Sequence, residues 1–111
     1  MIVLFFTDIQ KVLWTQLQAY FYSSLDKRYA PVVSDKAFSL IKTYFADEGD
    51  KIALSPEAES ALGENFKAFL FSRRICLTGE AADILTKGIM KIIHACIDDK
   101  AYVFALTLGE K

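Results

Sequence analysis

The chain is poor in the residues that define special classes of protein: it has two cysteines, two prolines, five glycines and one histidine in 111 residues. Two cysteines cannot build the disulfide scaffold that holds many small secreted domains together. The low glycine and proline content excludes a collagen-like chain and a low-complexity linker. No stretch approaches the roughly 18 consecutive apolar residues that a membrane-spanning helix needs, so no membrane partner is expected.

A strong charge of one sign is also missing. Lysine and arginine number 13 and aspartate and glutamate 14, so the formal net charge is −1. Proteins that bind nucleic acid in general are usually basic over the whole domain, and the balanced charge argues against that class. Hydrophobic residues make up 53% of the chain, which is enough for a buried core and excludes a disordered tail. We therefore expect a single domain over residues 1–111.

The apolar start of the chain does not resemble a secretion signal. Residues 1–6 lack a basic segment, and the run is about half the usual length before Asp8 interrupts it. We expect a cytoplasmic protein with free thiols.

Apolar residues recur at three- to four-residue spacing in four stretches, which is typical of amphipathic helices. These stretches predict helices over about 8–25, 35–46, 56–73 and 78–97. Ser55 before Pro56 is the clearest start, because serine caps a helix and proline suits the first helical position. Pro31 is expected to keep residues 26–33 outside any helix, with Ser34 capping the second one.

The two ends of the chain leave part of the fold open. Residues 101–108 are apolar and follow a charged break at 98–100; they predict either a strand paired with residues 1–4 or a short fifth helix. Thr7 or Asp8 is expected to cap the first helix, and Gly63 to mark a close helix crossing. The predicted fold is mostly α, a compact domain of four to five helices with room for a small two-stranded element formed by the termini.

No group of residues matches a metal site or a catalytic site. Zinc usually has four ligands in two close pairs, whereas only Cys76, His94 and Cys96 are available. Because they are two residues apart on a predicted helix, His94 and Cys96 point in different directions and cannot bind one metal ion together. No cysteine-enzyme motif surrounds Cys76. The acids of 57–64 are expected on a polar helix face, which does not raise a carboxyl pKa as a hydrolase site requires. We predict buried thiols, a partly exposed histidine, no metal, no cofactor and no enzymatic activity.

The acidic residues concentrate in one segment. Between residues 47 and 64, six acids face one lysine, a formal charge of −5. Localised charge steers and selects partners of opposite charge. A solvated loop followed by favourable first-turn acids is the alternative interpretation, since acids stabilise helix N-termini. The segment predicts a docking face for a basic protein partner, with these residues: Asp47, Glu48, Asp50, Glu57, Glu59 and Glu64.

Two runs of three large apolar residues, 20–22 and 69–71, stand out among the aromatics. Consecutive residues on a helix spread over about 200°, so one face cannot bury all three. One residue of each run is expected outside the core, and exposed aromatics often anchor protein interfaces. Tyr22 and Phe71 are the candidate anchors.

These features together predict a non-catalytic protein-binding module. Its concrete version is an immunity or antitoxin protein that neutralises a basic toxin or nuclease through the acidic face. One alternative is a nucleic-acid-associated regulator that uses a basic helix surface of Lys67, Arg73, Arg74, Lys87 and Lys91. A self-associating structural subunit, such as a homodimer, is the other alternative.

Overall fold

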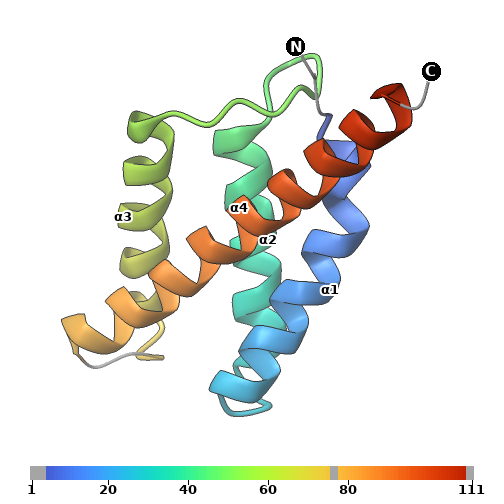
Figure 1. Cartoon of the computed structure of the whole chain (residues 1–111). Helices are drawn as coiled ribbons and strands as arrows, with labels where there is room; N and C mark the ends of the chain where they lie inside the picture. Colours follow the sequence, from blue (N-terminus) through green and yellow to red (C-terminus); the bar gives the residue numbers. More distant parts are fainter. Residues whose placement is uncertain (1–4, 76–77, 110–111) are drawn as a thin grey trace.

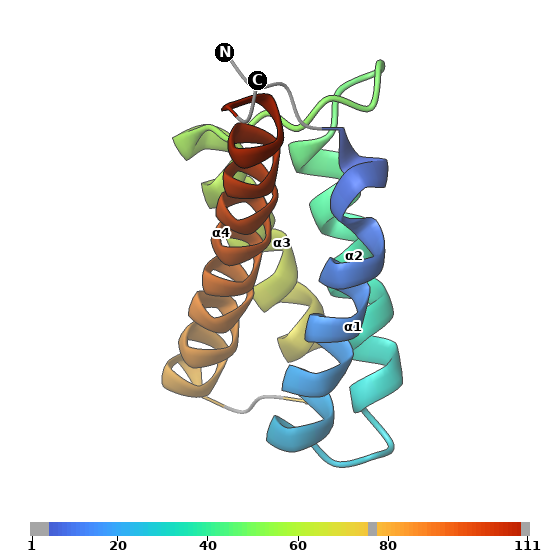
Figure 2. The same cartoon turned by 45° about the vertical axis from the view of Figure 1, so that its right-hand side comes forward.

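Four helices form the part of the chain that the structure, a computed structural model, describes: α1 (Phe6–Ser24), α2 (Ala30–Phe45), α3 (Pro56–Ser72) and α4 (Gly79–Gly109). The described residues are 5–75 and 78–109, and side chains in α4 are described as far as residue 98. The helices alternate in direction, and α4 runs obliquely across the others (Figure 1). Each helix packs on two neighbours, since α1 and α3 both contact α2 and α4. Seen from the side, α4 faces the layer of α1 and α2 (Figure 2). The predicted mostly helical single domain is confirmed.

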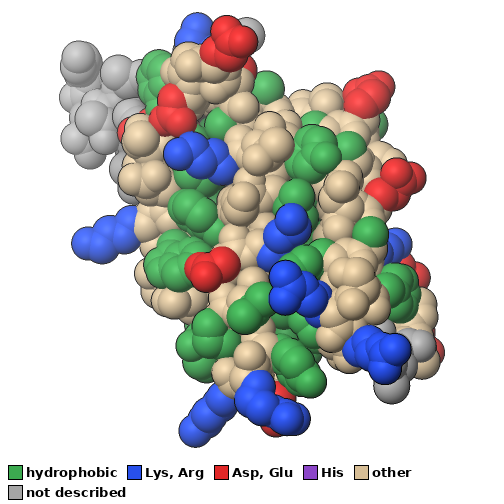
Figure 3. Space-filling model, turned by 180° about the vertical axis from the view of Figure 1, so that it is seen from behind, with side chains coloured by type: hydrophobic (Ala, Val, Ile, Leu, Met, Phe, Trp, Pro, Cys, Tyr) green, Lys and Arg blue, Asp and Glu red, His purple; other side chains and the backbone are tan. Residues whose placement is uncertain are grey.

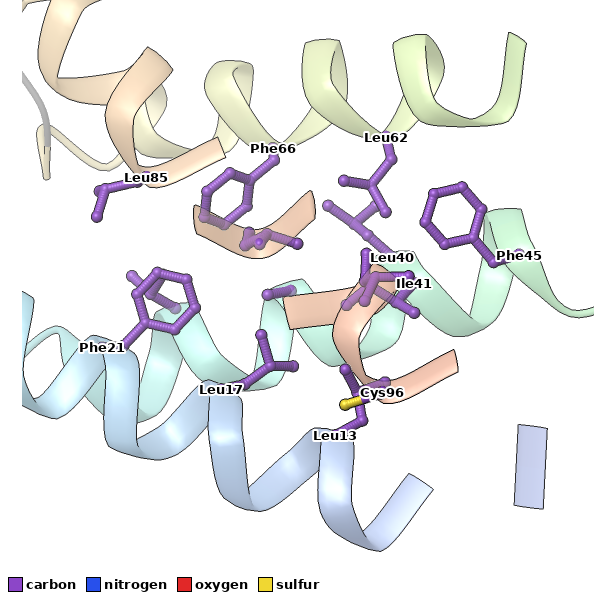
Figure 4. Packing of buried hydrophobic residues seen from close by; sticks show 14 of the residues in the cluster. Leu13, Leu17, Phe21, Leu40, Ile41, Phe45, Leu62, Phe66, Leu85 and Cys96 are labelled. Atoms are coloured by element: carbon purple, nitrogen blue, oxygen red, sulfur yellow. The ribbon is translucent and has the colours of Figure 1, made fainter. Parts of the chain in front are cut away.

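The four apolar stripes meet in one hydrophobic core (Figure 4). Phe21 of α1 and Phe66 of α3 lie near its middle, with ring centroids 6.0 Å apart. The core contains most of the residues that the helical spacing singles out, among them Ile9, Leu13, Leu17, Ile41, Phe45, Leu62, Leu70, Leu85, Ile89, Ile93 and Cys96. Burial of these side chains, at about 25 cal/mol per Å² of apolar surface, is the main force that holds the helices together.

The prediction for the start of α2 is wrong. The helix begins at Ala30, and Pro31 lies in its first turn rather than in a connection. A proline is tolerated there because the first N–H groups of a helix have no partner within it. The carbonyl oxygen of Asp26 accepts hydrogen bonds from the N–H groups of Tyr29 and Ala30, which turns the chain into the helix. Ser34 is therefore not a cap but a fully buried residue inside α2.

The two-stranded element is not supported either, and the break at residues 98–100 is absent. The helix α4 continues through these residues to Gly109, so 101–108 form neither a strand nor a separate helix. Charged residues do not stop a helix when they lie on its solvent side, and Asp98 is exposed. Residues 1–4 lie outside the described part. Within the described residues, extended backbone pairs only at isolated bridges, Phe5 with Lys51 and Ala46 with Ile52.

The starts of α3 and α4 follow the sequence signals, whereas those of α1 and α2 do not. The Ser55 hydroxyl accepts a hydrogen bond from the Ala58 N–H at 3.1 Å, and Thr78 does the same for Ala81 at 3.2 Å. At α1, however, the helix starts before the expected caps. Asp8 lies inside the first turn, and its carboxylate accepts a hydrogen bond from the Phe5 N–H at 2.9 Å.

Gly63 of α3 faces α4, where a Cβ would lie 3.4 Å from the methyl carbon of Thr86, an ordinary contact distance that leaves space for a methyl group. None of the helices, over the residues described, combines the length and the apolar character needed to cross a membrane.

Candidate functional site

Two of the acidic residues shape the connection between α2 and α3. The Asp47 carboxylate accepts hydrogen bonds from the N–H groups of Gly49 and Lys51, each at 2.9 Å. Asp50 has a left-handed backbone (φ 66°) and faces the start of α1. Its carbonyl oxygen accepts from the Phe6 N–H at 2.7 Å and its carboxylate from the Thr7 N–H at 3.1 Å. Asp47 therefore holds the turn and Asp50 caps α1, besides carrying charge.

The other four acids lie along α3 or at the tip of the turn. Glu59 contacts α4, with its Oε1 atom 2.8 Å from Nε2 of His94. Glu48, Glu57 and Glu64 are exposed, and no side-chain hydrogen bond or ion pair involves them within the described residues. Glu64 lies two turns beyond Glu57, further down the helix. The charges of Glu48 and Glu57 are thus available to a partner at the end of the bundle where α1 and α3 begin.

The candidate aromatic anchors do not lie beside these acids. Tyr22 and Phe71 are 47% and 42% exposed, which confirms that one residue of each run lies outside the core. They belong to the last turns of α1 and α3, whereas the acids lie where these two helices start. The structure therefore places the acids and the two anchors at opposite ends of the bundle (Figure 1).

A different aromatic residue lies at the acidic end. Phe5 is 39% exposed and pairs with Lys51 in the α2–α3 connection. We call the surface formed by Phe5, Asp8, Asp47, Glu48, Asp50, Glu57 and Glu59 the acidic end. Sequence reasoning missed Phe5 because it precedes the helix and has no place in a helical stripe. Its position in an apolar run beside a helix start gave no sign of exposure.

Basic residues gather at the opposite end. Lys27 and Arg28 lie in the α1–α2 connection, and Arg73 and Arg74 follow α3. Seen from behind, many of the lysine and arginine side chains lie over the middle and lower part of the molecule (Figure 3). A hydrogen bond from the Arg28 N–H lowers the pKa of Asp26, and the Arg28 side chain adds to this effect. At this end the four cations lie beside the acids Asp26 and Glu80, whereas the acidic end carries six acids beside Lys51, so the two ends differ in charge.

Several of the basic residues already have contacts inside the protein. Lys67 of α3 forms an ion pair with Asp83 of α4. Arg73 lies over the ring of Phe69, 5.5 Å from the centroid, and Lys36 lies at the same distance from that ring. The five cations expected on one basic helix surface belong to different helices. Lys87 and Lys91 lie on α4, whereas Arg73 and Arg74 lie at the end of α3.

A groove runs between the second half of α1 and the first half of α4. One part, of about 280 Å³, is lined by Leu25, Ile75, Ala81 and Leu85 together with Tyr20 and Ile84. A second part, of about 330 Å³, shares Tyr20 and Ile84 and is bordered by Lys87, Gly88 and Lys91. We call these two parts the α1–α4 groove. This groove could not be predicted from local sequence patterns, because its walls come from helices far apart along the chain.

The groups considered for chemistry do not form a cluster. His94 is half-exposed and Cys96 is buried on the same helix, as predicted for both. Cys76 lies outside the described residues. Among the residues that are described, no three His, Cys, Asp or Glu side chains gather closely enough to hold a metal ion.

Comparisons of the chain with protein-family models, curated proteins and solved structures found no match.

Proposed function

We propose that the chain is a non-catalytic protein-binding module that docks a basic partner protein on its acidic end. The observation that carries this proposal is the exposed ring of Phe5 among carboxylates at one end of a charge-separated bundle. Interfaces commonly combine a few large apolar anchors with a surrounding ring of polar residues. The acids would attract the partner from a distance, and Phe5 would supply apolar contact.

The roles within the acidic end differ. Glu48 and Glu57 are exposed and act mainly through their charge, while Asp47 and Asp50 also hold the turn that presents them. Glu64 acts at the margin, and Tyr22 and Phe71 would contact only a partner large enough to reach along the bundle. An immunity or antitoxin protein that covers a basic toxin or nuclease is the concrete form of this proposal.

The test compares two glutamates in equivalent local positions. Glu57 lies in the first turn of α3 at the acidic end, and Glu80 lies in the first turn of α4 at the opposite end. Partners of the tagged wild type are captured from a lysate of the source organism, and the affinity for a stoichiometric basic partner is measured. We expect Glu57→Lys, alone or with Glu48→Lys, to weaken binding by about 3- to 10-fold at low salt. The matched variant Glu80→Lys should bind like the wild type.

Salt dependence completes this test. The difference between wild type and Glu57→Lys should shrink as salt rises, because ions screen charges beyond about 10 Å at 0.1 M. An equal loss in Glu57→Lys and Glu80→Lys, or a partner of acidic character, contradicts the proposal.

The basic end supports a second candidate, a nucleic-acid-associated regulator. Arg28 and Arg74 are exposed there, and so are the rings of Tyr22 and Phe71 on which bases could stack. A fluorescence titration with single-stranded DNA at about 50 mM salt tests it, since binding of this kind weakens steeply with salt. Absence of binding under these conditions removes the candidate.

A further inference from the structure

The α1–α4 groove contains the most exposed large hydrophobic side chain among the described residues. Ile84 is 58% exposed, more than any other large apolar residue there. It stands between the two parts of the groove, which both use it as a wall. An exposed isoleucine alone is ordinary, but one set between two apolar hollows is typical of a surface that a partner covers.

Tyr20 bridges α1 and α4 between the two parts of the groove. The Tyr20 hydroxyl donates a hydrogen bond to the carbonyl oxygen of Ile84 at 3.4 Å. Gly88 faces the same ring and has no side chain, so α4 approaches α1 closely at this point. Tyr20 therefore spans the gap between α1 and α4, and both hollows beside it are present without a ligand.

The charge beside the groove indicates what kind of ligand fits. Lys87 and Lys91 border it one helical turn apart, and neither forms an ion pair within the described residues. The nearest acid on this part of α4, Asp83, forms its ion pair with Lys67 of α3, and Lys87 adds a weaker Coulombic effect on it. An apolar groove bordered by two lysines that form no ion pair within the described residues is complementary to a ligand with apolar and acidic groups in register.

The length of the groove indicates the shape of the ligand. From Ala81 to Lys91 the wall formed by α4 extends about 15 Å, which matches about three turns of a facing helix. Amphipathic helices bind such grooves through apolar residues at positions i, i+3 or i+4, and i+7. Two copies of this chain meeting symmetrically through the groove would instead bring the same lysines together.

We propose that the α1–α4 groove binds an acidic amphipathic helix of a second partner protein. Apolar side chains of that helix contact both sides of Ile84, and its carboxylates pair with Lys87 and Lys91. This site is separate from the acidic end, so a molecule that uses both surfaces would join a basic partner to an acidic one.

The experiment uses a displayed library of random 15-residue peptides selected on the wild-type protein. We expect the enriched sequences to carry a net negative charge and apolar residues at helical spacing. A synthetic copy of the most enriched peptide is then titrated into the ¹⁵N-labelled protein, and the amide signals of residues 20–25 and 81–91 should shift most.

Matched variants separate the groove from general surface effects. Ile84→Ser should weaken peptide binding at least 5-fold, whereas Val12→Ser, at an exposed apolar position that borders no part of the groove, should change it less than 2-fold. Lys87→Glu with Lys91→Glu should weaken binding at least 5-fold, and Lys42→Glu with Lys51→Glu should not.

Several results would overturn the proposal. The first two are a selection that enriches no peptide and one that enriches basic peptides. The third is an equal effect of Ile84→Ser and Val12→Ser on peptide binding. The fourth is single-stranded DNA that shifts the same amide signals and binds Ile84→Ser as well as the wild type. Concentration-dependent dimerisation that Ile84→Ser abolishes would assign the groove to a second copy of the chain and would also overturn it.

Discussion

Gly88 lies against the ring of Tyr20 so closely that a side chain at this position would overlap the tyrosine hydroxyl. The overlapping atoms are the hydroxyl and the outer part of the tyrosine ring, so the Tyr20 side chain must move before a residue with a Cβ fits here. Gly63 of α3, which faces another side of α4, has more space, since a Cβ there would lie 3.4 Å from the methyl carbon of Thr86. The space for a side chain therefore differs between the two positions: it is absent at Gly88 and sufficient for a methyl group at Gly63.

The first prediction compares alanine at these two glycines. Gly88→Ala should destabilise the protein by about 1–3 kcal/mol, because Tyr20 must move out of a packed position. Gly63→Ala should be neutral or stabilising by up to about 1 kcal/mol, because alanine favours the helix and the space suffices. Chemical denaturation measures both free energies of unfolding. Equal effects of the two substitutions would contradict the close contact at Gly88.

The second prediction concerns Ser34, whose buried hydroxyl has no hydrogen-bond partner among the described residues. Burial of an unpaired hydroxyl costs about 1–3 kcal/mol. Ser34→Ala should therefore raise the free energy of unfolding. Ser39→Ala, on the exposed side of α2, controls for the higher helix propensity of alanine. A gain at Ser34 no larger than at Ser39 would show that the buried hydroxyl has a partner.

The third prediction separates structural acids from acids that act only by charge. Asp50→Ala removes the carboxylate that caps α1 at Thr7, and loss of a cap costs about 0.5–2 kcal/mol. Glu48→Ala, in the same turn and exposed, should change stability by less than about 0.5 kcal/mol. Thermal unfolding followed by circular dichroism compares the two variants. A larger loss at Glu48 than at Asp50 would refute these assignments.

The fourth prediction follows from the ion pair between Lys67 and Asp83. A hydrogen bond from Lys67, aided by its charge, lowers the pKa of Asp83 below the ordinary value of 3.8. A lowered pKa means that the pair contributes stability above the pKa of the unfolded chain and that this contribution is lost as pH falls through the folded pKa. In Lys67→Met, an NMR titration should show the pKa of Asp83 returning toward 3.8, whereas Lys51→Met should leave it unchanged. An unchanged pKa in Lys67→Met would exclude the ion pair in solution.

Part of the candidate site was open to prediction from local patterns. The acidic segment is contiguous in sequence, so its charge reaches one region of the surface in any fold. The exposure of Tyr22 and Phe71 follows from three large residues in a row. The start of α3 after Ser55 could also be predicted, because a helix cap depends only on residues within one helical turn.

Other features depended on neighbours that local patterns do not reveal. A proline such as Pro31 either ends a helix or lies in the first turn of one. Here the helix begins at Ala30, where the carbonyl oxygen of Asp26 accepts hydrogen bonds from the N–H groups of Tyr29 and Ala30. The charged residues 98–100 look like a break in the sequence, yet α4 continues through them, and Asp98 lies on the exposed side of this long helix.

The amphipathic helices, their common core and the acidic connection follow from local patterns, because periodicity, capping and local charge act within a few residues. The surfaces that these elements form depend on the three-dimensional packing. It separated the acids from Tyr22 and Phe71, brought Phe5 beside the acids, and built a groove from Tyr20 and Ile84, which are 64 residues apart. The physical reason is that a surface depends on which helix faces lie side by side, and that is set by packing of the whole core.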